Sequence, residues 1–139
     1  MRNRIITTRE GVIMKEYVTW KQVEDYIDNV AERIKDLNIT GIFTFPRGGL
    51  VLATLLSYKT DLPILLAPCD NCVIIDDICD TGITLKKYSD LRKKKNYFIT
   101  TMYIKDDQLE ENAGEYQCEI DYFSYIKKDN WVIYPWERK

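Results

Sequence analysis

The stretch Val73-Ile74-Ile75-Asp76-Asp77-Ile78-Cys79-Asp80-Thr81-Gly82-Ile83-Thr84 indicates both the fold of this chain and its chemistry. An apolar strand leads to two adjacent carboxylates and then to a third. A Thr-Gly-x-Thr sequence follows at the expected start of a helix, where free amides, a glycine and two hydroxyls suit a phosphate. Adjacent carboxylates beyond a strand can bind two vicinal ribose hydroxyls or a hard cation.

A solvated acidic turn, with Thr81 or Thr84 as the helix cap, is the plainer interpretation of the same residues. Three acids beside the end of an apolar strand repel one another, however, so an ordinary turn would not be expected to contain them. The chain has neither a Walker motif nor a Gly-x-Gly-x-x-Gly motif, so the common nucleotide-binding loops do not compete with this interpretation.

The flanking sequence alternates between strand and helix patterns. Thr19 to Gln22 form a capping box, which predicts a helix that continues to about Leu37. The remaining apolar segments predict strands at 41–45, 62–66, 72–75 and 97–104, and helices at 50–58 and 85–95. Pro63 places the segment 62–66 at a sheet edge or a strand start, and 106–114 is expected to be a loop. The alternation predicts an α/β fold, a parallel sheet with helices on both faces.

Composition sets the class of protein. The chain has 139 residues, of which 45% are hydrophobic, and a net charge of −2, so it predicts one domain without the basic excess of a nucleic-acid-binding protein. It has no histidine, which excludes histidine bases and histidine metal ligands. Its four cysteines are expected to be free thiols in a reducing cytoplasm. No apolar run approaches the roughly 20 residues of a membrane span. We expect residues 1–16 to be an N-terminal extension and 17–139 to be the domain.

A second loop of interest, Pro46-Arg47-Gly48-Gly49, follows the predicted strand 41–45. Its guanidinium can pair with an anion, and its glycine amides can approach that anion closely. A plain strand-to-helix turn is the alternative, because glycines are common at such turns. Open parallel sheets bind ligands beyond the carboxyl ends of their strands, so both loops are expected at one edge of the sheet.

Together these motifs resemble those of the type I phosphoribosyltransferases, most closely the bacterial xanthine-guanine (hypoxanthine) branch. The segment 74–84 is similar to the signature that binds 5-phosphoribosyl-1-diphosphate, and Arg47-Gly48-Gly49 is similar to a loop that follows the first strand in that branch. The C-terminal segment Trp131-Val132-Ile133-Tyr134-Pro135-Trp136-Glu137 also matches, and the resemblance extends from about residue 17 to residue 137. It implies a single-domain type I phosphoribosyltransferase fold with a reduced hood over the site.

The resemblance implies a role for each matching residue. Asp80 would be the catalytic acid or base at the purine imidazole nitrogen. The phosphoribosyl diphosphate would be bound by Arg47 and Gly48 at its pyrophosphate, by Asp76 and Asp77 at its ribose hydroxyls, and by Thr81, Gly82, Ile83 and Thr84 at its 5-phosphate. The base would be bound by Lys105, Trp131 and Val132. Mg²⁺ is the implied cofactor, with Asp77 near it.

The implied function is a purine phosphoribosyltransferase of nucleotide salvage. It would form a 5′-nucleotide and pyrophosphate from 5-phosphoribosyl-1-diphosphate and a 6-oxopurine such as guanine, xanthine or hypoxanthine. Small molecules would be its partners, with no nucleic acid and no membrane, and a homodimer is expected by default. The alternatives are a noncatalytic sensor of phosphoribosyl diphosphate and a transferase for a different base. An RNA-binding regulator on this fold is a third, which the acidic charge disfavours.

Several candidate residues have plainer interpretations. Lys105 can be a solvated lysine at a strand end, and Trp131 can be a core aromatic. Cys69 and Cys72 form a Cys-x-x-Cys pair, for which zinc or redox chemistry is an alternative that the lack of histidine and of a second such pair disfavours. The segment 60–72 is short and contains no Arg or Lys, so the usual closing loop of the family is mostly missing.

Overall fold

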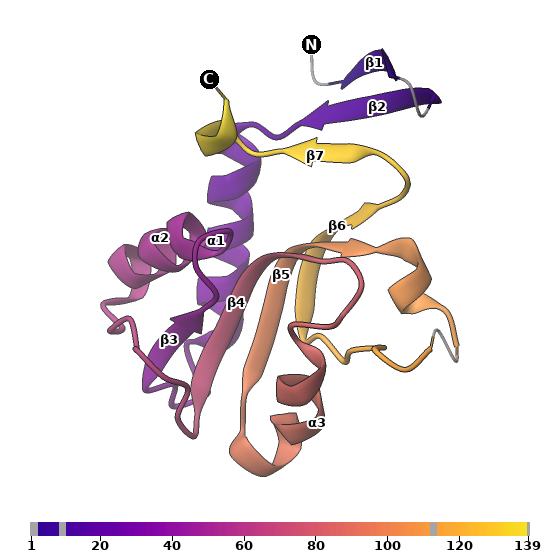
Figure 1. The fold of residues 1–139 in the computed structure, drawn as a ribbon. Helices are drawn as coiled ribbons and strands as arrows, with labels where there is room; N and C mark the ends of the chain where they lie inside the picture. Colours follow the sequence, from indigo (N-terminus) through magenta and orange to yellow (C-terminus); the bar gives the residue numbers. More distant parts are fainter. Residues whose placement is uncertain (1–2, 9–10, 112–113, 139) are drawn as a thin grey trace.

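The computed structural model describes residues 3–8, 11–111 and 114–138. At its centre is a four-stranded parallel sheet (Figure 1). Its strands, in spatial order, are β3 (Gly41–Thr44), β4 (Cys72–Cys79), β5 (Phe98–Lys105) and β6 (Tyr122–Lys127). The predicted α/β fold with a parallel sheet is therefore confirmed.

Helices cover both faces of this sheet, as predicted. They are α1 (Trp20–Ile34), α2 (Leu50–Thr60) and α3 (Lys86–Lys95). Successive side chains of a strand point to opposite faces. Accordingly, Ile75 of β4 packs in the cluster that includes α1 and α2, whereas Ile74 packs with Leu85 at the start of α3. The continuous apolar run of β4 is thus explained by burial on both of its faces.

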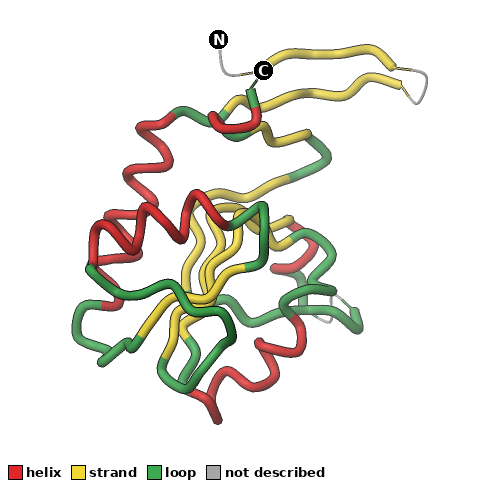
Figure 2. The backbone as a smooth tube through the Cα atoms, turned by 60° about the vertical axis from the view of Figure 1, so that its left-hand side comes forward, coloured by secondary structure: helices red, strands yellow, loops and turns green. Residues whose placement is uncertain are grey.

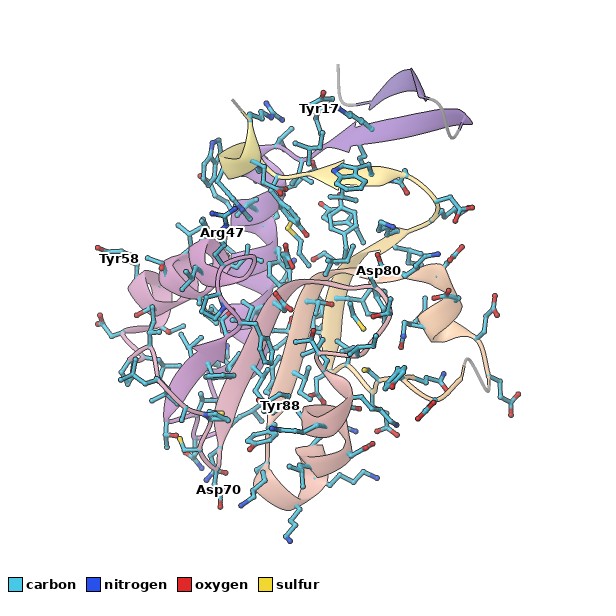
Figure 3. The ribbon with its side chains drawn as sticks, viewed as in Figure 1. Tyr17, Arg47, Tyr58, Asp70, Asp80 and Tyr88 are labelled. Carbon is cyan, nitrogen blue, oxygen red and sulfur yellow. The ribbon has the colours of Figure 1, made fainter. Side chains whose placement is uncertain are left out.

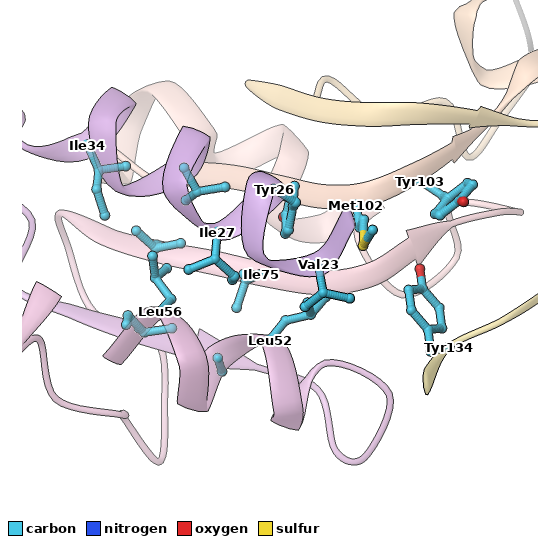
Figure 4. Packing of buried hydrophobic residues seen from close by; sticks show 14 of the residues in the cluster. Val23, Tyr26, Ile27, Ile34, Leu52, Leu56, Ile75, Met102, Tyr103 and Tyr134 are labelled. Atoms are coloured by element: carbon cyan, nitrogen blue, oxygen red, sulfur yellow. The ribbon is translucent and has the colours of Figure 1, made fainter. Parts of the chain in front are cut away.

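The larger core cluster fixes α1 and α2 against the sheet. Figure 4 shows Val23 and Ile27 of α1 near Leu52 of α2 and Ile75 of β4, all of them buried. Burial of each such aliphatic side chain stabilises the fold by about 1.5–3 kcal/mol. The polar tip of buried Tyr26 is paired as well, because its hydroxyl lies 2.7 Å from Thr100 Oγ1. This packing therefore holds the carboxyl ends of the central strands in fixed positions.

The capping box at the start of α1 is confirmed. The Gln22 amide donates to Thr19 Oγ1 at 3.1 Å, and the Thr19 amide donates to Gln22 Oε1 at 2.9 Å. Two of the orphan donors at a helix start are satisfied in this way. The helix ends at Ile34, three residues before the predicted end at Leu37.

A second, three-stranded sheet, here called the hood, lies over the carboxyl end of the first (Figure 1). Its order is β1 (Asn3–Thr8), β2 (Gly11–Tyr17) and β7 (Trp131–Ile133). The first two strands form an antiparallel hairpin, which projects above the rest of the chain in Figure 2. β2 pairs in parallel with β7, with Tyr17 opposite Ile133. The segment expected as an N-terminal extension thus supplies two of the three strands of the hood.

The predicted strand 62–66 is wrong. Only Ile64 forms a bridge, to Ile42 at the outer edge of β3. Two backbone hydrogen bonds flank it, from the Ile42 amide to the Pro63 carbonyl at 2.9 Å and from the Leu65 amide to the Ile42 carbonyl at 2.8 Å. Pro63 has no amide hydrogen to donate, and the side chain of Leu66 is fully exposed, so the pairing stops after one residue.

Two element boundaries around the segment 73–84 also differ from the sequence-based expectation. β4 continues to Cys79 instead of ending at Ile75, because Asp76, Ile78 and Cys79 still pair with β5. Asp76 and Asp77 therefore belong to β4 itself and not to the loop after it. The helix that follows begins at Lys86, so the Thr-Gly-x-Thr sequence forms a separate loop before α3.

Candidate functional site

The predicted functional loops meet at one edge of the sheet. Figure 3 shows Arg47, after β3, and Asp80, after β4, at the end that faces the hood, whereas Asp70 lies at the opposite end. Because all four central strands are parallel, their carboxyl ends share this edge. The topology therefore brings together side chains that lie far apart in the sequence.

The loop after β3 packs directly against the carboxylates of β4. A Cβ atom added to Gly48 would lie 2.8 Å from Asp77 Oδ2, and one added to Gly49 would lie 2.0 Å from Thr44 Oγ1. The Thr44 hydroxyl in turn donates to the Ile75 carbonyl at 2.6 Å. Only glycines allow this close approach, so the Arg47-Gly48-Gly49 sequence serves the contact between the two loops as well as the turn. The Arg47 side chain is exposed beside it.

The adjacent carboxyl groups of Asp76 and Asp77 are partly buried, so charging them is unfavourable. Burial, together with the neighbouring Asp77 charge, raises the pKa of Asp76 to about 8, and burial also raises the pKa of Asp77. None of the described Lys or Arg side chains forms an ion pair with either carboxylate. The Asp77 amide donates to Asp76 Oδ1 at 2.9 Å, which holds the two groups together. Such oxygen donors fit a hard cation or sugar hydroxyls.

The described residues contain no cluster of three His, Cys, Asp or Glu side chains that could hold a metal ion. The zinc interpretation of Cys69 and Cys72 therefore gains no support from those residues. It is compatible with Mg²⁺ at Asp77, since Mg²⁺ is commonly bound by one or two carboxylates together with substrate phosphates and water.

Most residues of the loop between β4 and α3 are exposed. Thr81, Ile83 and Thr84 are exposed, and Gly82 is buried with a φ of +84°. The helix cap is Leu85, which makes no side-chain hydrogen bond, so the interpretation of a threonine-capped turn is wrong. Thr81 Oγ1 instead accepts from the Ile83 amide at 3.4 Å. Free amides at a helix start suit an anion.

Gln108, which the sequence reasoning did not identify, forms hydrogen bonds to the backbone of this loop. It lies in the 3₁₀ turn that follows β5 and is buried. Its Nε2 donates to the carbonyls of Thr81 at 3.1 Å, Tyr116 at 3.3 Å and Asp80 at 3.4 Å, and its Oε1 accepts from the Cys118 amide at 2.9 Å. These bonds hold the carbonyls of Asp80 and Thr81 toward Gln108 and so fix the course of the loop. A glutamine within an acidic run of the expected loop 106–114 was the only signal in the sequence.

Beyond β5 and β6 the edge is cationic as well as acidic. Lys105, which is 22% exposed, lies 3.7 Å from Asp107 Oδ2 and 3.6 Å from Asp129 Oδ1 through its Nζ. Partial burial lowers the pKa of Lys105 and the surrounding carboxylates raise it, with a net increase. Lys127 Nζ lies 3.5 Å from Asp80 Oδ2. Lys105 is therefore held in place by two carboxylates, unlike a freely solvated lysine.

The hood places the C-terminal residues above this edge. Trp131 on β7 is 62% exposed, which excludes the core interpretation, and Val132 beside it is half-buried. The Tyr134 hydroxyl donates to the Asp77 carbonyl at 2.6 Å, so the end of the chain is anchored directly to β4. Glu16 of β2 accepts from the Tyr103 hydroxyl of β5 and, at 3.2 Å, from Asn130 Nδ2. The hood is thus tied to the central sheet at two places.

Cys79 lies within the signature, but it is not poised for reaction. It is buried and hydrogen-bonded to Cys118, and that bond together with burial raises the pKa of Cys79 far above its ordinary value. Since the thiolate is the reactive form, this cysteine has a packing role.

No helix among the described residues is both long and apolar enough to pass through a bilayer.

Comparisons with known proteins agree with this geometry. No family model matches the chain. Among solved structures, it is similar to a purine phosphoribosyltransferase from Pyrococcus horikoshii at 27% identity and a TM-score of 0.70, over 90% of this chain and 95% of that one. A xanthine-guanine-hypoxanthine phosphoribosyltransferase from Helicobacter pylori shares 18% identity with a TM-score of 0.60, over 88% and 93% of the two chains.

A third solved structure widens the range of bases. An adenine phosphoribosyltransferase from Giardia lamblia in complex with 9-deazaadenine has 14% identity and a TM-score of 0.60, over 90% of this chain and 93% of that one. The chain therefore has the type I phosphoribosyltransferase fold, and the resemblance identified from the motifs is confirmed. Because 95% of the Pyrococcus chain is matched, little of that enzyme lacks a counterpart here.

Proposed function

We propose that this protein is a Mg²⁺-dependent purine phosphoribosyltransferase of nucleotide salvage, which forms a 5′-nucleotide and pyrophosphate from 5-phosphoribosyl-1-diphosphate and a 6-oxopurine. One observation carries the proposal: the glycine loop after β3 lies against the Asp77 carboxylate, at the edge where the loop 81–84 begins, which is exposed except at Gly82. In this proposal the sites for the diphosphate, the ribose and the 5-phosphate are contiguous. Similarity to solved phosphoribosyltransferases over about nine-tenths of the chain supports the transferase.

Each part of the sugar substrate has a suitable group. The Asp76 and Asp77 carboxylates accept hydrogen bonds from the ribose hydroxyls, and the amides of 81–84 receive the 5-phosphate. Exposed Arg47 and the backbone at Gly48 bind the diphosphate. Mg²⁺, held by Asp77, would neutralise charge on the departing pyrophosphate. Binding a cation and hydroxyl donors also relieves the repulsion between the two partly buried carboxylates.

The base would lie between the hood and the edge of the central sheet. Exposed Trp131 offers its ring for stacking, and the Val132 backbone reads the edge of the base. Lys105 donates to the 6-oxo group, and Asp80 exchanges a proton with the imidazole nitrogen of the purine. The 6-oxopurine preference rests on these residues, because the solved neighbours include enzymes named for other bases.

The reaction needs little covalent help from the protein. Pyrophosphate is displaced from the anomeric carbon by a purine nitrogen, and holding the two reactants in line supplies much of the acceleration. The hood limits access of water from above, since it is anchored through Tyr134 and Glu16. We further propose that the protein works as a homodimer in the cytoplasm.

A protein that binds phosphoribosyl diphosphate without catalysis is the second candidate. Only residues 61–71 separate α2 from β4, which leaves little chain for a loop that closes over the site. A lost loop would weaken pyrophosphate binding and water exclusion more than it would weaken binding of the ribose and 5-phosphate.

A nucleotide-formation assay distinguishes the two. The protein is given phosphoribosyl diphosphate and Mg²⁺ with guanine, xanthine, hypoxanthine, adenine or orotate, and Asp80→Asn is the matched control. Turnover of a 6-oxopurine that falls by about a hundredfold or more in the control supports the transferase. Calorimetric binding of phosphoribosyl diphosphate without turnover of any base supports the binding protein, and neither turnover nor binding refutes both.

A further inference from the structure

Two lysines stand side by side at the carboxyl edge of the sheet. Lys105 is the last residue of β5 and Lys127 the last residue of β6, and they are direct partners in the parallel register. Like charges directly opposite one another on neighbouring strands destabilise a sheet. Such a pair therefore calls for an explanation beyond the fold.

Lys127 is the more buried of the two. Its side chain is 15% exposed, against 22% for Lys105 and at least 33% for the other described lysines that form ion pairs. Lysines are seldom buried to this extent unless they are paired. The Lys127 ammonium donates to the Lys128 carbonyl at 3.3 Å and lies 3.5 Å from Asp80 Oδ2. Among the described residues it is the only cation paired with Asp80.

The two lysines have different partners, which separates their roles. The Lys105 charge is compensated by two loop carboxylates, Asp107 and Asp129. Lys127 reaches past β5 to the residue that directly follows β4, and its carboxylate partner is the proposed acid or base itself. Asp80 remains 45% exposed, so the ion pair leaves room for a substrate at this carboxylate.

We infer that Lys127 is a specificity-determining residue that holds Asp80 against the base and, with Lys105, makes this edge of the base site rich in hydrogen-bond donors. The inference rests on the proposed function, which places an imidazole nitrogen of the purine at Asp80 and the 6-oxo group at Lys105. An ammonium has three donors and no acceptor. A 6-oxo group, an acceptor, is therefore bound, whereas a 6-amino group meets donors and is left unpaired.

The test compares two nucleotides that differ at the 6-position, inosine 5′-monophosphate and adenosine 5′-monophosphate. Their dissociation constants are measured by calorimetry for the wild type, Lys127→Met, Lys127→Arg and Lys128→Met. Lys127→Met removes the charge but keeps most of the stem, and Lys128→Met removes an exposed charge one residue later. Turnover of hypoxanthine and adenine is measured on the same four proteins.

The wild type is expected to prefer the inosine nucleotide. Lys127→Met should weaken its binding by roughly tenfold to a hundredfold, the range of a hydrogen bond to a charged group. Binding of the adenosine nucleotide should weaken less, because it loses only the positioning of Asp80, so the preference for the inosine nucleotide falls. Lys127→Arg should retain most of the preference and Lys128→Met all of it, which a merely structural role of Lys127 would not produce.

The outcomes separate this inference from the proposed function. Turnover of hypoxanthine with a preference that Lys127→Met leaves unchanged overturns the inference alone. No turnover, together with a preference that Lys127→Met abolishes, supports the inference and refutes the enzyme. Should Lys127→Met fail to fold, loss of the preference in Lys127→Gln supports the inference and its retention overturns it. A wild type that binds both nucleotides equally, or neither, also overturns it.

Discussion

Replacing Gly82 with alanine should damage the fold and the proposed phosphate loop together. Gly82 has a φ of +84°, and an added Cβ would lie 1.9 Å from the Tyr116 carbonyl oxygen and 2.9 Å from Gln108 Nε2. The first of these atoms belongs to the backbone, so the segment around Tyr116 must move. Gly114 offers a matched control: its φ is +124°, but no described atom lies within 4 Å of its added Cβ.

The two substitutions share a conformational cost and differ in the steric one. A left-handed backbone costs a residue other than glycine about 1–2 kcal/mol, and a forced shift of packed atoms costs typically about 1–3 kcal/mol more. Gly82→Ala should therefore lower the free energy of unfolding by about 2–5 kcal/mol. Gly114→Ala should show a conformational loss alone, of order 1–3 kcal/mol at most, because its loop can relax.

Urea denaturation of both variants measures these losses, and calorimetry measures the affinity for phosphoribosyl diphosphate. We expect Gly82→Ala to be the less stable variant and to lose binding, and Gly114→Ala to bind as the wild type does. Equal destabilisation of the two would refute the steric argument. Unchanged binding in Gly82→Ala would refute the assignment of this loop to the phosphate.

Three further predictions concern the groups around this loop. Because the pKa of Asp76 is raised to about 8, its charged form destabilises the folded state; wild-type stability should fall as the pH rises from about 4 through 8, where each pKa unit is worth about 1.4 kcal/mol. Asp76→Asn should flatten this dependence in urea titrations at pH 5 and pH 8, and a parallel decline in the variant would assign it to other groups. Gln108→Leu should cost about 1–3 kcal/mol in denaturation, since the buried Cys118 amide loses its partner, and should also weaken binding of phosphoribosyl diphosphate; intact binding would contradict its positioning role. Gly48→Ala would bring a Cβ to 2.8 Å from Asp77 Oδ2, so calorimetry should show affinity for phosphoribosyl diphosphate reduced roughly tenfold while denaturation shows a loss below about 1 kcal/mol; the reverse pattern would place Gly48 in a purely structural role.

The elements that the sequence predicted well are those determined by local patterns. The capping box at Thr19 and the helical spacing that follows it lie within a few residues of one another, so the start of α1 could be predicted correctly. The β4 signature was likewise recognised from contiguous residues. By contrast, the length of β4 is set by pairing with β5, and the strand at 62–66 failed for want of a partner beyond Ile42. Neither the length of β4 nor the absence of a pairing partner for 62–66 can be predicted from local sequence patterns.

The candidate site divides in the same way. The motif residues could be found because their types and spacing are unusual, and the structure brings Gly48 and Asp77 into contact. Gln108 and Lys127 could not be found, since each acts through a neighbour that is distant in sequence: Gln108 through carbonyls of the loop after β4, and Lys127 through Asp80. Their side chains carry no motif, and only the register of the strands gives them a role.

The pairing of β2 with β7 has a consequence for how the protein is made. Lys15 lies opposite Trp131, so the first of these strands leaves the ribosome more than a hundred residues before its partner. The central sheet, which ends at Lys127, is complete before the hood can close. The hood strand β7 follows all four strands of the central sheet in the sequence, so it is synthesised after them. The synthesis of β7 (Trp131–Ile133) therefore decides when the proposed binding edge can acquire its cover, and a ligand bound at that edge would act as a template for this pairing.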